Sequence, residues 1–82
     1  EFYVFPNPFN SYISIQNVNE GSYHSEPQTY CIYDIYGRKL LFGDCKLWQP
    51  IENSGDLLSG FYILTLESKG HIRSFKIIKS EQ

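Results

Sequence analysis

The side chains that most often do chemistry in proteins are few and scattered in this sequence. His24 and His71 have no carboxylate or cysteine at a spacing typical of a catalytic pair. Together with Cys31 and Cys45 they could be drawn around a zinc ion, but their separations match none of the recurrent ligand patterns. These four residues therefore predict neither a metal site nor a nucleophile.

Asp34 and Asp56 are the carboxylates that could be paired for acid–base work. Each lies in a stretch with the composition of a turn, where Asp accepts hydrogen bonds from nearby backbone N–H groups, so turn capping is the favoured role. The sequence also lacks a glycine-rich phosphate loop, a nucleophile elbow and a ribbon of alternating basic and aromatic residues. We therefore predict a chain that is not an enzyme and holds no metal and no cofactor.

Aromatic residues suggest a different kind of site. Trp48 with Tyr23, Tyr33 or Tyr36 could form a platform on which a sugar ring stacks. In a small β-protein such residues more often fill the core or pair across strands. A carbohydrate-binding or adhesive module of a secreted enzyme is thus an alternative function, and sugar binding that depends on Trp48 would distinguish it.

The stretch 57–79 is the clearest element that could position any of these side chains. Tyr62, Leu64 and Leu66 follow the strand period of two, so their row should face a core. Residues 68–70 (SKG) predict a three-residue hairpin loop. The second arm, 72–78, lacks a clean alternation, so we expect it to be partly buried on both sides or to carry a bulge.

The remaining segments are short and separated by turn signals. The apolar run 2–5 ends at two prolines, Ile13 should share a face with Ile15, and Tyr30 should share one with Ile32. A type I turn at 34–37 is expected to join 28–34 to 38–42. Stretch 45–51 is limited by Pro50 to an edge or a strand end, and 17–27 and 52–56 are predicted loops. Short strands with a turn every 8–12 residues predict an all-β fold, an antiparallel immunoglobulin-like β-sandwich of about seven strands.

The two cysteines permit one disulfide without requiring it. Folding about the 34–37 turn sets Cys31 opposite Leu40 or Leu41, and Cys45 then lies several residues further along, too far for a relaxed bridge in this hairpin. A bridge through another sheet and two buried thiols both remain open, and the thiols are favoured.

Charge is distributed unevenly along the 82 residues. The net charge is −2, but residues 1–68 carry −5 and residues 69–82 carry +3. The basic end is either a solvated edge strand, which lysines protect from pairing with other chains, or a docking tail for an acidic partner. A pI near 5.5 excludes the electrostatic footprint of a nucleic-acid-binding protein. No signal peptide or transmembrane run is present, and the missing initial Met suggests a fragment of a longer chain.

Four short motifs, in order along the chain, resemble those of one known family. Residues 3–10 (YVFPNPFN) are similar to its opening YPNPFN, 32–38 (IYDIYGR) to its central iyD..Gr turn, 57–62 (LLSGFY) to L.sGvY, and 76–79 (KIIK) to its closing KivK. Over nearly its whole length the chain resembles the type A C-terminal sorting domain of the type IX (Por) secretion system. It departs from the pattern before Leu57, where the family usually has an apolar residue and this chain has Ser54 and then Gly55, so local pairing should differ there.

The resemblance implies an immunoglobulin-like sandwich, with 1–82 as one sorting domain at the end of a secreted protein. The implied partners are N-terminal cargo domains of the same chain, the outer-membrane translocon, and a sortase-like cysteine protease. That protease would remove the domain in the linker near or before Glu1, commonly joining the cargo to anionic lipopolysaccharide. The implied location is the periplasm in transit, then the cell surface or the outside, without a membrane-embedded segment. A domain that only caps its parent structurally is a third possibility.

Physical reasoning about such a sorting domain suggests roles for particular residues. We expect the fold to depend on eight of them: Pro6, Asn7, Pro8, Asp34, Gly37, Arg38, Gly60 and Tyr62. We expect residues 72–82 to dominate translocon recognition, because an exposed strand edge can pair with a receptor while lysines set the register. The residues at the centre of this hypothesis are Lys76, Ile77, Ile78 and Lys79.

Overall fold

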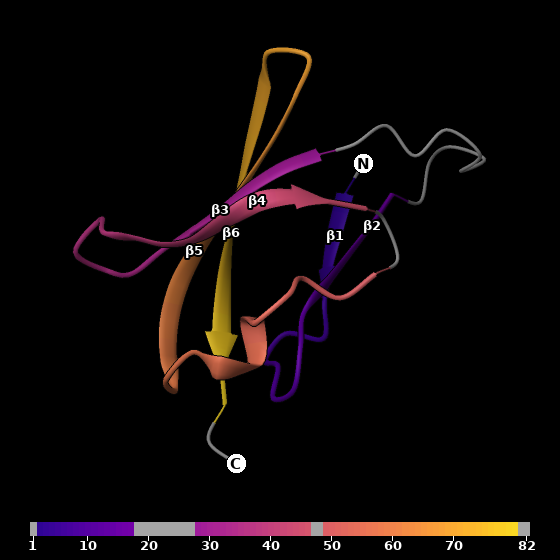
Figure 1. Cartoon of the computed structure of the whole chain (residues 1–82). Coiled ribbons are helices and arrows are strands. Elements are labelled where there is room, and N and C mark those ends of the chain that lie inside the picture. The colour runs from indigo at the N-terminus through magenta and orange to yellow at the C-terminus, as the bar shows by residue number, and fades with distance from the viewer. Residues whose placement is uncertain (1, 18–27, 47–48, 81–82) are drawn as a thin grey trace.

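The computed structural model describes residues 2–17, 28–46 and 49–80, which form two antiparallel sheets (Figure 1). One sheet pairs β1 with β2, and the other has four strands in the order β4-β3-β5-β6. A short 3-10 helix, η1, lies between β4 and β5. The bounds are β1 Phe2–Phe5, β2 Ser14–Asn17, β3 Gln28–Tyr33, β4 Lys39–Cys45, η1 Ser54–Asp56, β5 Gly60–Ser68 and β6 His71–Lys79. The predicted all-β, antiparallel sandwich is confirmed, with six strands among the described residues.

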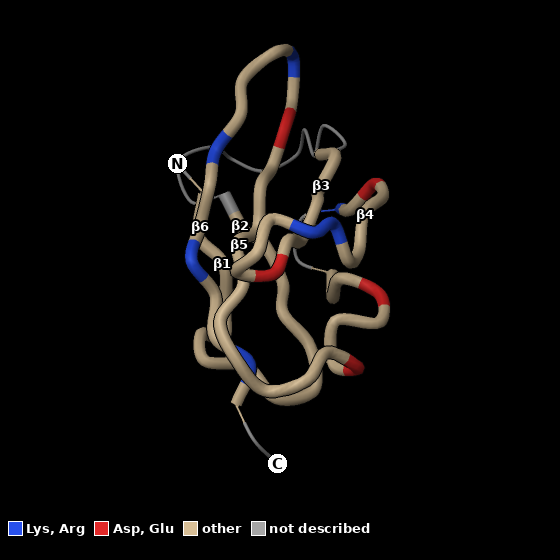
Figure 2. The backbone as a smooth tube through the Cα atoms, turned by 90° about the vertical axis from the view of Figure 1, so that its left-hand side faces the viewer, with Lys and Arg blue, Asp and Glu red and all other residues tan. Residues whose placement is uncertain are grey.

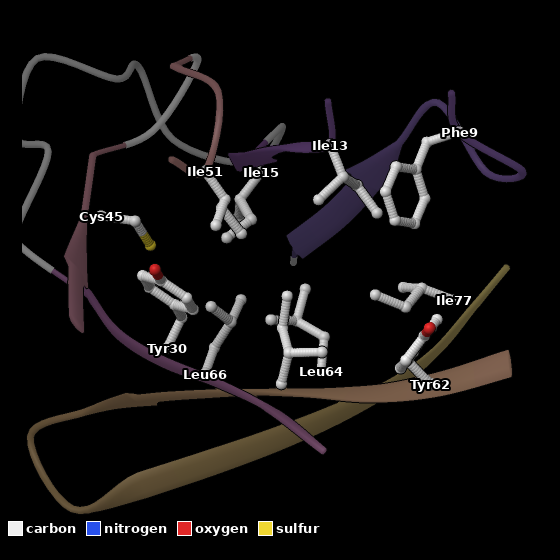
Figure 3. Packing of buried hydrophobic residues seen from close by; sticks show 11 residues of the cluster. Phe9, Ile13, Ile15, Tyr30, Cys45, Ile51, Tyr62, Leu64, Leu66 and Ile77 are labelled. Atoms are coloured by element: carbon white, nitrogen blue, oxygen red, sulfur yellow. The ribbon is translucent and has the colours of Figure 1, made fainter. Parts of the chain in front are cut away.

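The core lies between the two sheets (Figure 3). Ile13 and Ile15 are fully buried and point from the β2 side toward Leu64 and Leu66 of β5. Burying each such aliphatic side chain contributes about 1.5–3 kcal/mol before entropy is counted. The three inward rows predicted from alternation are confirmed. The buried apolar residues are Phe9, Ile13, Ile15, Tyr30, Ile32, Cys45, Ile51, Tyr62, Leu64, Leu66 and Ile77.

The β5–β6 hairpin differs from its prediction in the length of its loop. Ser68 pairs with His71, so the loop contains two residues, not three. Lys69 and Gly70 have φ of 53° and 81°, the left-handed pair of a type I′ turn, whose twist matches that of the flanking strands. The pairing then continues without a shift from Ser68–His71 to Gly60–Lys79, so the second arm carries no bulge. The other alternative expected for this arm, partial burial on both sides, fits the structure, since Ile77 is buried on one face and Ile78 is half-buried on the other.

The irregular alternation of β6 has another cause. β6 lies at the edge of its sheet, and its half near the turn extends beyond the opposing sheet (Figure 1). On the inward face of β6, Arg73 is therefore exposed, whereas Phe75 is half-buried and Ile77 and Lys79 are buried. The inward face of β6 is buried over its second half only. The sequence of the strand therefore shows no regular alternation of apolar and polar residues.

A bulge does occur, but in the β3–β4 hairpin. The register shifts between Ile32 and Tyr33, which pair with Leu41 and Lys39 and leave Leu40 as the extra residue. Cys31 consequently lies opposite Phe42, not opposite Leu40 or Leu41 as predicted. The expectation that Cys45 lies further along is confirmed, since it pairs with Gln28.

Several other expectations can be compared with the described residues. The run 2–5 is the strand β1, and bends at 6–8 end it as predicted. Most of the predicted loop 17–27 lies outside the described residues, and so does the middle of 45–51. At the end of that stretch Pro50 bridges Ser14, and the N–H of Ile51 donates to the carbonyl of Ile13 at 2.8 Å. The chain after β4 thus returns to the two-stranded sheet.

Candidate recognition surface

The first and last motifs of the chain are joined in space. The side-chain amide of Asn7 donates to the carbonyl of Lys76 at 3.0 Å, and its oxygen accepts the N–H of Ile78 at 2.9 Å. Phe9 continues the contact, because its N–H donates to the carbonyl of Ile78 and its carbonyl accepts the N–H of Ser80. Residues 7–9 therefore act as a short parallel strand that closes the outer edge of β6 over its second half.

The 76–79 motif is divided between two faces by this geometry. Ile77 is fully buried and Lys79 is 6% exposed, with its Nζ donating to the carbonyl of Ser80 at 3.3 Å. Lys76 is exposed and Ile78 is half-buried on the opposite face of the sheet. Of the four predicted recognition residues, only Lys76 and Ile78 present their side chains outward.

The predicted type I turn after β3 is confirmed and is held by its acidic residue. The N–H of Gly37 donates to the carbonyl of Asp34, and Gly37 has φ of 85°. The Asp34 carboxylate accepts the N–H groups of Tyr36 and Arg38 through Oδ1 and the Nε–H of Arg38 at 2.7 Å through Oδ2. Asp34 thus caps the turn, as predicted.

These contacts set the protonation of Asp34. Partial burial by itself would raise the pKa of this carboxyl group. The backbone N–H and the guanidinium of Arg38, together with the N–H of Tyr36, outweigh that effect and lower the pKa. The carboxylate is accordingly held in its charged form where it organises the turn.

The 57–62 motif leads into β5 beside this turn. Gly60 begins the strand with φ of 149°, opposite Lys79. The hydroxyl of Tyr62 donates to the carbonyl of Leu58, which ties the strand to the preceding loop. Residues of both motifs line one shallow, mostly apolar groove: Asp34, Ile35, Tyr36, Arg38, Leu40, Asp56, Leu57, Leu58, Ser59, Gly60, Phe61 and Tyr62.

The departure from the family pattern before Leu57 is resolved by two contacts. Ser54 is fully buried; its Oγ accepts the N–H of Ile13 at 3.1 Å and donates to the carbonyl of Ile51 at 2.8 Å. Gly55 packs so closely against Ser11 that a Cβ would lie 2.1 Å from its carbonyl oxygen. A hydrogen-bonded hydroxyl therefore occupies the core position where the family usually has an apolar side chain.

Within the described part of the chain, the residues considered for metal binding are not brought together. Cys31 is half-buried on the outer face of the four-stranded sheet, whereas Cys45 faces the core, and both are free thiols. The bridge left open at the sequence level is therefore not formed. Among the described residues no three candidate ligands converge on one point. His24, Tyr23 and Trp48 lie outside the described residues, so the sugar platform cannot be placed.

Positive charge follows the last strand. Figure 2 shows basic residues spaced along β6, at one edge of the molecule. Arg73 lies over the ring of Phe2 at 4.9 Å, and Lys76 lies over the ring of Phe61 at 5.1 Å. Backbone N–H and C=O groups along a strand point to the same edge at every second residue, so those of Ile72 and Ser74 point to the outer edge of β6, as those of Ile78 do. Only the half of this edge near the turn is left uncovered by residues 7–9.

The described residues thus form a small antiparallel sandwich whose first and last motifs are joined by hydrogen bonds. A comparison with known families shows which family this chain belongs to. Residues 3–80 match the secretion system C-terminal sorting domain, and the chain belongs to this family. It is thus a C-terminal sorting signal of type IX secretion, which implies export toward the cell surface or the extracellular space.

Two further findings bear on the setting. No curated protein matches the chain significantly. The described part of the chain contains no helix with the length and apolar character needed to cross a membrane.

Sequence reasoning missed one further surface. Leu40, Phe42, Phe61, Ile63 and Ile72 are apolar yet exposed. A signal was available in Phe61 and Ile63, which are apolar at the alternate positions of a strand whose other row already faces the core. Such a strand is expected to be covered on both faces, and here one face has no cover within the described chain.

Proposed function

We propose that this chain is a non-catalytic C-terminal signal that directs N-terminal cargo domains of the same protein through the type IX outer-membrane translocon. The cargo passes from the periplasm to the cell surface or beyond, and a sortase-like cysteine protease then removes the signal. Family membership and the placement of the terminal motifs support this proposal.

The observation that carries the proposal is the docking of β6 onto residues 7–9. Because five hydrogen bonds join Asn7 and Phe9 to residues 76–80, the signal has a fixed shape and joins both ends of the domain. The side chains of Lys76 and Ile78 then face the partner. Ile77 and Lys79 anchor the strand from below, and main-chain pairing with a receptor is limited to the half of the edge near the turn.

Because the last strand both fills the core and displays side chains, truncating it is not an informative test of recognition. Deleting residues 76–82 removes Ile77 from the core as well as any contact surface, so loss of export would have two explanations. Point variants separate them. The chain is fused to a neutral reporter in a host with the type IX machinery, and reporter is measured in the periplasm and at the surface.

Lys76→Glu is expected to retain the reporter in the periplasm, because it reverses an exposed charge without touching the core. Lys79→Met keeps a long buried side chain without its charge and is expected to be exported. Lys46→Glu makes the same charge change after β4, at the opposite edge of the sheet, and serves as the matched control. Normal export of the Lys76→Glu fusion would show that Lys76 is not a contact residue. If the wild-type fusion is not exported, the proposed function itself is wrong.

A further inference from the structure

The outer face of the four-stranded sheet carries an ordered pattern of side chains. Register places Lys39, Tyr33, Ile63 and Lys76 in one row across all four strands, so a lysine stands at each end of an apolar centre. The neighbouring row begins with Phe42 and Cys31 and continues with Thr65 and Ser74. On the other side of the lysine row, Phe61 lies beside Ile78.

Both lysines lie against exposed aromatic rings. Lys76 is 5.1 Å from the ring centre of Phe61, and Lys39 is 5.4 Å from that of Phe42. The two rings are 54% and 68% exposed. Each ring keeps a large apolar area in water and holds an ammonium group above it, an arrangement that desolvation by a partner would strengthen.

The acidic residues of this face are kept at its other end. The next row runs from Asp44 through Thr29 and Glu67 to Ile72, and it places both carboxylates beyond the Phe42 row. The face is therefore apolar with cations on both edges over one half, and acidic over the other. An exposed apolar patch rimmed by polar and charged residues marks a protein-binding surface.

We propose that this outer face is a docking surface for a protein of the export apparatus that presents an apolar patch bordered by carboxylates. The inference rests on the proposed function and adds a second edge to it, since Lys39 and Phe42 lie on β4, at the far side of the sheet from Lys76. Charge complementarity selects the partner: two lysines border the apolar centre. The two carboxylates at the other end disfavour an anionic lipid surface, which needs a larger basic cluster.

The test measures binding of the full chain, fused to the neutral reporter, to detergent-solubilised type IX translocon purified from an export-competent host. Phe42→Thr and Lys39→Glu are the test variants, because Thr keeps β-propensity while removing the ring. Tyr3→Thr is the matched control, since Tyr3 is a 48% exposed aromatic on β1 in the other sheet. Thermal melting establishes that each variant remains folded.

Each test variant is expected to raise the dissociation constant about tenfold or more, as for an interface anchor, while Tyr3→Thr stays near the wild type. Lys39→Glu should also flatten the salt dependence of binding, and Phe42→Thr should leave it unchanged. Wild-type-like binding by both test variants, with Lys76→Glu impaired, would overturn the second edge and leave the proposed function standing. A wild-type fusion that is neither exported nor bound would overturn both.

Vesicles of phosphatidylethanolamine and phosphatidylglycerol provide the remaining arm. The wild-type chain is expected not to bind them at moderate salt. Binding to these vesicles that Lys39→Glu abolishes, together with unchanged binding to the translocon, would assign the face to a membrane surface and overturn the proposal.

Discussion

The side-chain oxygen of Asn7 accepts the backbone N–H of Ile78, across 71 positions of sequence, at 2.9 Å. The amide nitrogen of the same side chain donates to the carbonyl of Lys76. An asparagine amide has one acceptor and one donor end, so it can imitate the backbone of a neighbouring strand. The two ends of the sorting domain are joined by this imitation, and several predictions depend on contacts of the same kind.

Asn7→Ala removes both bonds and is expected to lower the free energy of unfolding by about 1–2 kcal/mol, because an exposed hydrogen bond contributes about 0.5–1.5 kcal/mol net. For a domain of this size that is a fall of about 4–8 °C in Tm per kcal/mol. Thermal melting by circular dichroism measures it. Asn10→Ala, an exposed asparagine three residues on, should melt like the wild type. Equal melting of the two variants would contradict the role of Asn7.

Ser54→Ala tests the buried hydroxyl that replaces an apolar family residue. The variant leaves the N–H of fully buried Ile13 without its acceptor, which should cost about 1–3 kcal/mol. Urea unfolding should show a lower midpoint with an unchanged slope. Ser59→Ala, at an exposed serine, is the control and should change stability by no more than about 0.5 kcal/mol. If Ser54→Ala matches that control, the hydroxyl is not needed.

Gly55→Ala tests the close approach to Ser11. The new Cβ would lie 2.1 Å from the carbonyl oxygen and 2.9 Å from the carbonyl carbon, so the backbone itself must move. We expect a loss of about 3 kcal/mol or more, at the upper end for overpacking. Gly70→Ala is the comparison: it has open space but φ of 81°, and should cost about 1–2 kcal/mol. A larger loss at Gly70 than at Gly55 would contradict the steric argument.

Much of this fold could be predicted because local signals agreed with it. The alternation of Tyr62, Leu64 and Leu66 fixed an inward row, and Asp34 with Gly37 fixed a turn. The extra residue at Leu40 could not be predicted, since a bulge is set by how two strands pack and not by either one alone. The same limit applies to the recognition motif: whether Lys76 or Lys79 is the buried lysine depends on which face of β6 the rest of the fold covers.

Contacts between distant segments were the other gap. The sequence marked residues 7 and 78 as belonging to separate motifs, but nothing in either indicated that one would close the edge of the other. Ser54 was noticed only as a departure from a pattern. The Ser54 hydroxyl is tolerated in the core because it makes two hydrogen bonds, one with the N–H of Ile13 and one with the carbonyl of Ile51. Ile13 is 41 positions away in the sequence, so this contact cannot be read from the local pattern.

Asp34 predicts a dependence of stability on acid. Its pKa is lowered in the folded state, so the folded state favours the charged carboxylate. The resulting stability is present above the unfolded pKa of about 3.9 and is lost as pH falls below it toward the lower folded value. Melting temperatures from pH 7 to 2 should therefore fall less in Asp34→Asn, which cannot titrate, than in the wild type.

The control for this series is Asp44→Asn, which removes an exposed carboxylate from β4. The contrast between the two variants isolates the contribution of the Asp34 turn. An Asp34→Asn profile that follows the wild type down to pH 2 would mean that the turn does not select the charged form.

Cys45 predicts a thiol that reacts only after unfolding. Desolvation by burial, and then the negative charge of Asp44, raise its pKa from 9.0 to about 11. Because the thiolate is the reactive form, Cys45 should be protected at pH 8 both by protonation and by its buried position. Cys31 is half-buried on the other face and supplies the comparison.

Labelling with a disulfide reagent at pH 8 distinguishes the two thiols in matched variants. Cys45→Ser should react at once through Cys31, whereas Cys31→Ser should react only at the rate of unfolding and fully in guanidinium chloride. The raised pKa of Cys45 also makes the free energy of unfolding depend on pH. The contribution of Cys45 is fully present below about pH 9 and is lost as the pH rises through about 11. Equal labelling rates in the two variants would show that Cys45 is accessible to solvent. The inward orientation of Cys45 on β4, and with it the β3–β4 register, would then be wrong.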